Sequence, residues 1–261
     1  MPEIKDTVAV ITGGGGGIGK ALARHWIDNG GKVVIADISE EILVKAKEDL
    51  GPAAETFLCN VTREEDNFAL ASFAIEKFGK INMIAPFAGI ISDGLMINTD
   101  RETGKVKKKM SLEQFQRVVE INLTGVFLTV RECAEQMVNN NCRGLICLIS
   151  STGSLGTAGQ INYSSTKAAI SVMPKVITAE FFRRGLSDKI RCVAIAPGYV
   201  GTEMVKRMNQ KALANILSDV PIKRLIKPEE VAALAGDIFR NEALAGDTFF
   251  IHGGLRLGSK G

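Results

Sequence analysis

Short apolar runs alternate with amphipathic stretches from one end of the 261-residue chain to the other, and few folds accommodate that alternation. Runs rich in β-branched residues predict strands at Thr7–Thr12, Lys32–Ala36, Glu55–Cys59, Met83–Ala85, Gly144–Ser150, Arg191–Ala196 and Thr248–Ile251. Helical periodicity lies between them, at Ile18–Asn29, Ser39–Leu50, Glu64–Phe78, Ser111–Asn139, Tyr163–Arg184 and Lys227–Arg240. Because buried strands separated by helices form a parallel sheet covered on both faces, the pattern predicts a doubly wound α/β fold.

No internal repeat, low-complexity tract or linker interrupts this series, so we expect residues 1–261 to form a single domain. Two segments depart from the alternation. The polar, lysine-rich Ser92–Met110 predicts a solvated hairpin or loop, with contact to an acidic or phosphorylated part of a substrate as the alternative. Gly201–Ile222 has a helical pattern and follows Pro197-Gly198, which predicts a flap over a site.

The charge balance and composition exclude several classes of partner. A net charge of +3, with two tyrosines and one tryptophan, argues against nucleic acid, which usually needs a basic stripe with interleaved aromatic residues. The five cysteines form no C-x-x-C pair and there are two histidines, so we expect no metal site and a reducing compartment. Because the chain lacks a targeting pattern and a membrane-spanning run, we expect a soluble cytoplasmic protein.

A glycine-rich run, Thr12-Gly-Gly-Gly-Gly-Gly-Ile-Gly19, connects the first predicted strand to the first predicted helix. Glycines permit a tight turn and a close backbone approach, and the N-terminus of the following helix favours a pyrophosphate. A glycine-rich run can also be a flexible loop. Its place between strand and helix is the context that a dinucleotide-binding motif requires, so we predict nucleotide binding.

Asp37 ends the second predicted strand, eighteen residues after Gly19. A carboxylate there can accept hydrogen bonds from the adenosine ribose diol and would repel a 2′-phosphate. No Arg or Lys lies in Gly13–Gly17 or directly after Asp37 to bind such a phosphate, which favours NAD(H) over NADP(H). The alternative role for Asp37 is a helix N-cap, which Ser39 could fill as well.

Tyr163 and Lys167 lie one helical turn apart in Asn162-Tyr-Ser-Ser-Thr-Lys167, and Ser150 precedes Tyr163 by thirteen residues. A phenol has a pKa of about 10, so it is a poor acid–base catalyst until its phenolate is stabilised. The lysine ammonium at i+4 can supply that stabilisation. The group can move a proton to or from a carbonyl oxygen, although a Tyr and a Lys at this spacing also occur on helix surfaces for solubility alone.

Together these motifs resemble the short-chain dehydrogenase/reductase family, and the resemblance spans essentially the whole chain. The family's Thr-Gly-x-x-x-Gly-x-Gly motif is matched by Thr12 to Gly19, and its Tyr-x-x-x-Lys motif by Tyr163 and Lys167. Further matches are the helix asparagine at Asn122, the partner serine at Ser150, Pro197-Gly198 with Val200 and Thr202, and the closing Ile251-His-Gly-Gly254. The resemblance implies a single-domain Rossmann-type fold and hydride transfer between a nicotinamide and a secondary alcohol or ketone.

The resemblance also implies roles for individual residues. Tyr163 is the general acid or base, and Lys167 lowers the pKa of Tyr163 and binds the nicotinamide ribose. Ser150 positions the substrate oxygen, with Ser151 as the runner-up because its spacing is one residue short. Asn122 holds a water that links Lys167 to solvent. With NAD as the cofactor, the implied binding residues are Thr12, Gly13, Gly17, Ile18, Gly19, Asp37, Ile38, Asn60, Val61, Ala88, Gly89, Tyr163, Lys167, Pro197, Gly198, Val200 and Thr202.

Two positions depart from the family pattern. Pro86-Phe87 stands where the family usually has two asparagines, which removes side-chain amides and one backbone donor beside the cofactor ribose. We expect weakened bracing there rather than lost binding, because Ala88-Gly89 keeps the close backbone approach. Asn60 stands where an aspartate often contacts adenine, and it can still donate and accept hydrogen bonds.

The substrate is less well defined by the sequence. The expected walls, Ile90–Met96, Ser154–Gln160, Tyr199 and Gly201–Leu217, are mainly apolar and suit an acyl, alicyclic or aromatic ketone better than a sugar. The resemblance is nearest to 3-oxoacyl reductases and 3-hydroxyacyl dehydrogenases, and a steroid ketone is an alternative. A nucleotide-binding regulator on the same fold is a further alternative. The family usually forms dimers or tetramers through the two long helices, so we expect a homo-oligomer, with a homotetramer as the expected form.

Overall fold

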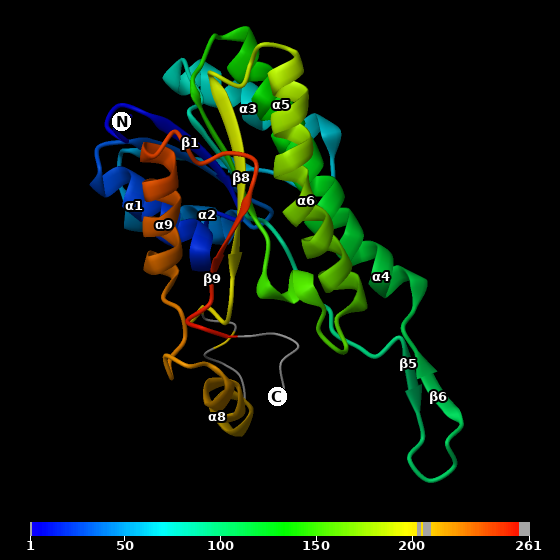
Figure 1. Ribbon diagram of the computed structural model, residues 1–261. Coiled ribbons are helices and arrows are strands. Elements are labelled where there is room, and N and C mark those ends of the chain that lie inside the picture. The colour runs from blue at the N-terminus through cyan, green and yellow to red at the C-terminus, as the bar shows by residue number, and fades with distance from the viewer. Residues whose placement is uncertain (1, 203–204, 206–209, 256–261) are drawn as a thin grey trace.

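Parallel strands form the central seven-stranded sheet of the computed structural model, which describes residues 2–202, 205 and 210–255 (Figure 1). The strand order is β3-β2-β1-β4-β7-β8-β9. The chain therefore forms β1 to β3 on one side of β1 and then crosses to the other side for β4, β7, β8 and β9. This reversal between β1 and β4 leaves a crevice at the carboxyl ends of the strands. The strands are β1 (Val8–Thr12), β2 (Lys32–Asp37), β3 (Ala54–Leu58), β4 (Met83–Pro86), β7 (Gly144–Ile149), β8 (Ile190–Pro197) and β9 (Thr248–Ile251).

Helices cover both faces of this sheet, as Figure 1 shows. On one face lie α1 (Gly17–Asp28), α2 (Glu40–Leu50) and α9 (Pro228–Arg240). On the other lie α3 (Glu64–Phe78), α5 (Gly125–Asn139) and α6 (Ile161–Arg183). The helix α4 (Leu112–Val119) continues into α5 through a π-helical turn, Glu120–Thr124.

Alternate residues of each central strand supply the two cores. In β1, Ala9 and Ile11 pack towards α1 and α9, whereas Val10 packs towards α3 and α5, and all three are fully buried. Successive strand residues point to opposite faces, so an uninterrupted apolar run is what a strand covered on both sides requires. The predicted doubly wound α/β fold is confirmed.

Element bounds agree with the sequence prediction to within two residues. At two helix starts the predicted first residues, Ser39 and Ser111, lie one position before α2 and α4. Each is an N-cap whose hydroxyl accepts a hydrogen bond from a backbone N–H three residues later, Ile42 for Ser39 and Gln114 for Ser111. An N-cap has non-helical backbone angles although it satisfies the first turn, which explains the difference.

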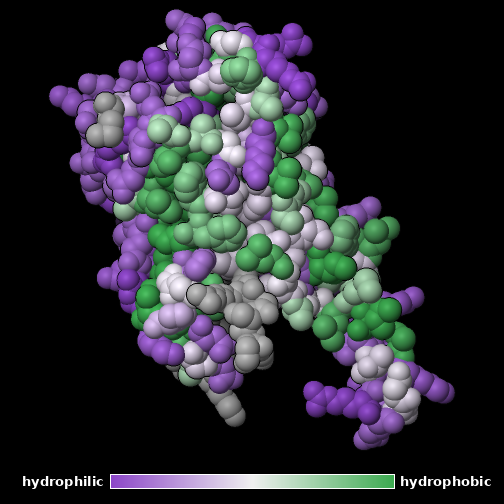
Figure 2. Space-filling model, viewed as in Figure 1, coloured by the Kyte–Doolittle hydropathy of each residue, from purple (hydrophilic) through white to green (hydrophobic). Residues whose placement is uncertain are grey.

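The lysine-rich segment forms an antiparallel hairpin of β5 (Ile97–Thr99) and β6 (Val106–Lys109) that projects beyond α4 (Figure 1). We call residues 95–110 the arm. The carboxylate of Asp100 accepts hydrogen bonds from the N–H groups of Glu102 and Thr103 and so closes the turn. All strand residues of the arm are exposed, with apolar surface towards the body and polar surface at the tip (Figure 2). The predicted solvated hairpin is confirmed.

Part of the predicted Gly201–Ile222 helix is present as α8 (Gln210–Asp219). Residues 203–204 and 206–209 of that segment lie outside the described residues, so the flap remains a prediction. Within the described part of the chain, no helix is both long and apolar enough to cross a membrane. The same part contains no cluster of His, Cys, Asp and Glu side chains that could hold a metal ion.

Candidate active site

Two adjoining cavities open at the carboxyl ends of the strands, where the strand order reverses. The first, of about 460 Å³, lies at the ends of β1 and β2. The second, of about 290 Å³, lies at the ends of β7 and β8 and against α6. They form one continuous depression, because both are lined by Ile18, Phe87, Gly89, Ile90, Ile149 and Thr202.

The glycine-rich turn between β1 and α1 lines the first cavity. Gly13 has φ of +64°, and a Cβ at this position would lie 2.8 Å from the Cα of Ala88. A Cβ at Gly19 would lie 2.4 Å from the carbonyl oxygen of Gly13. The N-cap of α1, Gly16, provides no side-chain hydrogen bond, so the first N–H groups of the helix are left for another partner. A turn that only glycine can form, ending at a free helix N-terminus, fits a pyrophosphate.

Asp37 lies at the end of β2 in the same cavity, beside Ile38 and Asn60. Its Oδ1 accepts a hydrogen bond from the backbone N–H of Ser39 at 3.2 Å. Ser39 itself caps α2, so the alternative N-cap role does not fall to Asp37. Among the described residues that line this cavity there is no Arg or Lys. Among these described lining residues Asp37 carries the one fixed charge, and a carboxylate suits a ribose diol better than a phosphate.

Tyr163 and Lys167 lie together in the second cavity, on the first two turns of α6. Lys167 is only 4% exposed, and its ammonium donates a hydrogen bond to the carbonyl oxygen of Ile149 at 2.8 Å. The Nζ atom lies over the Tyr163 ring, 5.6 Å from the ring centroid. Burial lowers the pKa of Lys167 to about 8. The pair is therefore turned into the protein and is not a solubility feature of a helix surface.

The pKa of Tyr163 is shifted by its surroundings. Burial of the phenol raises this pKa, a hydrogen bond with Ser151 lowers it, and the carboxylate of Asp93 raises it further. The ammonium of Lys167 lies over the phenol ring and donates to a backbone carbonyl. The predicted lowering by Lys167 stays a prediction.

The Ser150 hydroxyl bonds to α6 in the structure. The Oγ atom donates to the carbonyl oxygen of Lys167 at 2.8 Å and lies 2.7 Å from the Oγ of Ser171. Ser151 instead forms the hydrogen bond that shifts the pKa of Tyr163. A Cβ built on Gly153 would lie 3.3 Å from both the Ser151 hydroxyl and the Tyr163 ring. The side chains of Ser151 and Tyr163 therefore both lie next to Gly153. The assignment of the substrate-facing hydroxyl to Ser150, with Ser151 as the runner-up, stays a prediction, and these contacts favour Ser151.

Asn122 lies in the π-helical turn between α4 and α5 and is fully buried. Its Oδ1 accepts from the backbone N–H of Ile90 and its Nδ2 donates to the carbonyl oxygen of Ile90, both at 2.8 Å. The Asn122 amide therefore pairs with both backbone groups of Ile90, as a residue of an adjacent strand would, and fixes the chain after β4. A π-turn of this kind occurs frequently at functional sites.

The Pro86-Phe87 departure is accommodated by Thr12. The backbone N–H of Phe87 donates to the carbonyl oxygen of Thr12 at 3.1 Å, and the N–H of Ala88 donates to the Oγ1 of Thr12 at 3.3 Å. Phe87 also lines both cavities. Backbone groups and Thr12 therefore support the segment in place of the missing side-chain amides. The expectation of weakened bracing stays a prediction, since it concerns strength and not position.

The structure brings most of the expected site residues together. The first cavity is lined by Gly13, Gly17, Ile18, Gly19, Asp37, Ile38, Asn60, Val61, Ala88, Gly89 and Thr202. The second is lined by Ser150, Tyr163, Lys167, Pro197, Gly198 and Val200. Thr12 and Asn122 are buried behind these linings.

The expected substrate walls are present only in part. Ile90, Ile91, Thr157, Gln160 and Tyr199 line the second cavity, as do Thr202 and Val205 from the predicted flap. Leu95 and Met96 instead lie exposed at the base of the arm. Sequence reasoning missed Ile149, whose carbonyl oxygen binds Lys167, and no side-chain signal could have identified a backbone acceptor.

Comparisons with known proteins agree with this geometry. A sequence model of the short chain dehydrogenase family matches residues 7–213. The chain is 31% identical to a 3-oxoacyl-(acyl-carrier-protein) reductase of Thermotoga maritima, over 97% of this chain and 99% of that protein. It is also 31% identical to a 3-hydroxyacyl-CoA dehydrogenase type-2 of Drosophila melanogaster, over 97% of this chain and 99% of that protein.

Among solved structures, the fold is similar to that of a 3-ketoacyl-(acyl-carrier-protein) reductase from Brucella melitensis complexed with NADH. The two share 26% sequence identity with a TM-score of 0.82, over 96% of this chain and 98% of that chain. The similarity therefore covers the sheet, both helical layers and the crevice between them.

Proposed function

The chain belongs to the short-chain dehydrogenase family, and we propose that it is an NAD(H)-dependent oxidoreductase that interconverts a secondary alcohol and a ketone. The observation that carries this proposal is the buried Lys167 one turn of α6 from Tyr163, in a cavity continuous with the glycine-rich turn. A buried ammonium beside a phenol has no structural purpose that an apolar residue would not serve better.

The residues of the crevice fit a nicotinamide dinucleotide. The glycine-rich turn and the N-terminus of α1 would hold its pyrophosphate, and Asp37 its adenosine ribose. Lys167 and Val200 would lie towards the nicotinamide end, together with Pro197-Gly198 and Thr202. When bound, the nicotinamide supplies or accepts the hydride, and its oxidised form adds a positive charge to the cavity.

Tyr163 is the proposed general acid and base, and Ser151 the proposed hydrogen-bond donor to the substrate oxygen. In ketone reduction, the phenol donates its proton to the oxygen as negative charge develops there, while the Ser151 hydroxyl stabilises the same charge. In alcohol oxidation the phenolate accepts that proton. The positive charge of Lys167 favours the phenolate against the effect of burial. Because both ends of the Asn122 amide are bound to Ile90, a relay water would bind at the backbone of the π-turn.

A 3-oxoacyl or 3-hydroxyacyl thioester is the substrate that we favour. The relatives with this chemistry align with nearly the whole chain, and Phe87, Ile90, Ile91 and Tyr199 give the second cavity an apolar wall. An alicyclic, aromatic or steroid ketone is the alternative that the same wall could accept. A nucleotide-binding regulator is less favoured, because such a protein would not need to keep Tyr163 and Lys167 together at the cavity.

The test is the appearance of NADH absorbance when purified protein is mixed with NAD⁺ and a 3-hydroxyacyl-CoA. Tyr163→Phe should lower turnover by at least about 100-fold, since acid–base catalysis contributes this much or more, while NADH binding is retained. Ser151→Ala should lower turnover by about 10- to 1000-fold, and Ser150→Ala by less, because the Ser150 hydroxyl bonds to α6. Undiminished turnover in Tyr163→Phe would refute the mechanism.

A further inference from the structure

Segment 92–94 follows Ile90 and Ile91, which line the second cavity, and side chains of Gln114, Gln160 and Asn162 bind it. Gln114 of α4 donates from Nε2 to the carbonyl oxygens of Ser92 and Asp93, both at 3.1 Å. Gln160 donates from Nε2 to both carboxylate oxygens of Asp93 at 3.0 Å, and the N–H of Gly94 donates to the carbonyl oxygen of Gly159 at 2.8 Å. The segment is therefore fixed to the chain that leads into α6.

Asn162 is the third side chain that binds this segment, and unlike Gln114 and Gln160 it also contacts the backbone of Tyr163. Its side chain is fully buried, and its Nδ2 donates to the carbonyl oxygen of Ser92 at 2.9 Å. Its Oδ1 accepts a hydrogen bond from the backbone N–H of Tyr163 at 2.8 Å. One amide thus joins the cavity wall to the backbone of the residue that carries the phenol.

The first turn of α6 explains why this amide has a particular effect. The N-cap of the helix, Gln160, makes no side-chain cap bond, so the early N–H groups of the helix have no partner from it. Asn162 satisfies the N–H of Tyr163 in its place. Because Ile90 is bound by Asn122 and Ser92 by Asn162, the wall from Ile90 to Ser92 has a fixed position relative to Tyr163.

We propose that Asn162 is a positioning residue, which holds Tyr163 against the Ile90–Ser92 wall so that the phenol meets the substrate oxygen. This inference rests on the proposed function of Tyr163. A displacement of the order of 1 Å at a catalytic group can cost about 100-fold in rate. Loss of the Asn162 amide should therefore lower kcat by about 10- to 100-fold and leave KM and NADH affinity within about threefold.

The test compares Asn162→Ala and Asn162→Asp with Gln114→Ala. Asn162→Asp keeps an acceptor for the Tyr163 N–H but loses the donor to Ser92. Gln114→Ala removes a second donor to the same Ser92 oxygen without touching Tyr163. Both Asn162 variants should lose kcat, and Gln114→Ala should retain it within about threefold.

A second measurement does not depend on activity. The chain has two tyrosines, so in a Tyr199→Phe background the ultraviolet absorbance of phenolate reports Tyr163 alone. The charged groups near the phenol, Lys167 on α6 and Asp93 after β4, remain in Asn162→Ala and Gln114→Ala, whereas Asn162→Asp adds a carboxylate and is left out of this measurement. Because burial is the main cause that raises the pKa of Tyr163, a loosened phenol should titrate at lower pH in Asn162→Ala and unchanged in Gln114→Ala.

The outcomes separate this inference from the proposed function. Full kcat and an unshifted phenol in folded Asn162→Ala would overturn the positioning role, as would an equal kcat loss in Gln114→Ala. If Tyr163→Phe is inactive while Asn162→Ala is fully active, only the positioning role is lost. If Tyr163→Phe is active, the proposed mechanism itself is wrong.

Discussion

The ammonium of Lys167 is an unusual charge to find buried, and it links the catalytic proposal to stability. Burial lowers its pKa from 10.5 to about 8. Between these values the unfolded chain holds more protons than the folded protein, so stability rises with pH in this window. Below about pH 8 the folded protein bears the full cost of the buried charge, about 3 kcal/mol from the size of the shift.

Lys167→Met should therefore be more stable than the natural protein at pH 7, and the difference should shrink as pH rises from about 8 towards 10. The measurement is the free energy of unfolding in denaturant at several pH values, without added cofactor. Lys175→Met is the control, because Lys175 lies exposed on the same helix. A stability difference that does not change with pH would contradict the buried ammonium.

Asp37 supports a second prediction at this scale, on the choice of cofactor. Asp37→Ala removes the carboxylate from a cavity lining in which the described residues include no Arg or Lys. The preference for NAD over NADP in kcat/KM should narrow by about 10-fold or more, because repulsion of a 2′-phosphate is lost together with the ribose bond. Asp37→Asn separates the two effects, since it removes the charge and keeps an acceptor for the Ser39 N–H. An unchanged ratio in both variants would refute the ribose role.

At the scale of elements, the sequence predicted the sheet and its covering helices but not their local interruptions. Residues 111–139 read as one helix, yet the structure contains a π-turn at Glu120–Thr124. The turn coincides with the contacts between Asn122 and Ile90, which are distant in sequence. Helical periodicity reports only which face is apolar, so it cannot reveal a distortion that depends on a partner from another element.

The two serines illustrate the same limit. Their spacing to Tyr163 differs by one residue, and that spacing favoured Ser150. Adjacent residues after a strand point in different directions, so only the three-dimensional contacts decide which hydroxyl meets Tyr163. In the structure the Ser150 hydroxyl donates to a carbonyl of α6, whereas it is Ser151 that lowers the pKa of Tyr163.

The arm gives a prediction at the element scale. Its strand residues are exposed and the two strands pair with each other, so replacing residues 97–109 by Gly-Gly should leave folding intact. Segment 92–94 and its hydrogen bonds remain, and we expect kcat and KM for a small uncharged ketone to change by less than about twofold, as for surface changes in general. The alternative is that the arm lysines contact a charged part of the substrate. In that case the deletion should raise KM for an acyl-CoA, and the increase in KM should be larger at low salt than at high salt.

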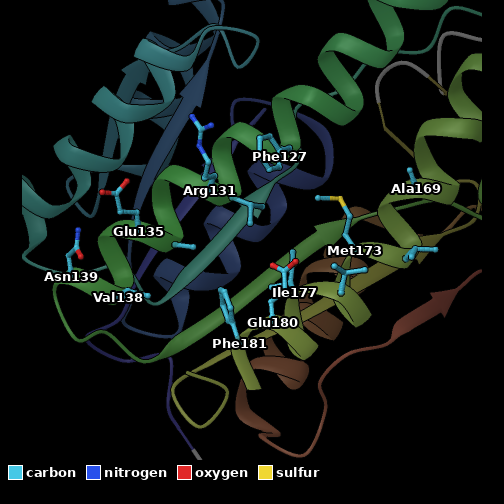
Figure 3. A pocket seen from close by; sticks show the side chains of 14 residues that line it. Phe127, Arg131, Glu135, Val138, Asn139, Ala169, Met173, Ile177, Glu180 and Phe181 are labelled. Carbon is cyan, nitrogen blue, oxygen red and sulfur yellow. The ribbon is translucent and has the colours of Figure 1, made fainter. Parts of the chain in front are cut away.

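For the whole molecule, the layer formed by α5 and α6 has an apolar outer face. A hollow of about 550 Å³ lies between these helices, with Phe127 and Val138 on α5 and Met173 and Ile177 on α6 (Figure 3). Phe127 and Val172 are about half exposed, at 49% and 56%. An apolar face of this kind usually marks an interaction site. The expected homo-oligomer would bury it between two copies of the chain.

Val172→Glu places a charge on that face and should therefore shift the protein from an oligomer towards single chains, because an unpaired carboxylate is costly in an apolar interface. The measurement is molecular mass by light scattering over a range of protein concentrations. Val44→Glu is the matched control, since Val44 is 55% exposed on α2, a helix of the opposite layer. A mass unchanged in Val172→Glu, or lowered equally in both variants, would contradict association through α5 and α6. Because α6 also carries Tyr163 and Lys167, any loss of turnover in the dissociated variant would link assembly to the site.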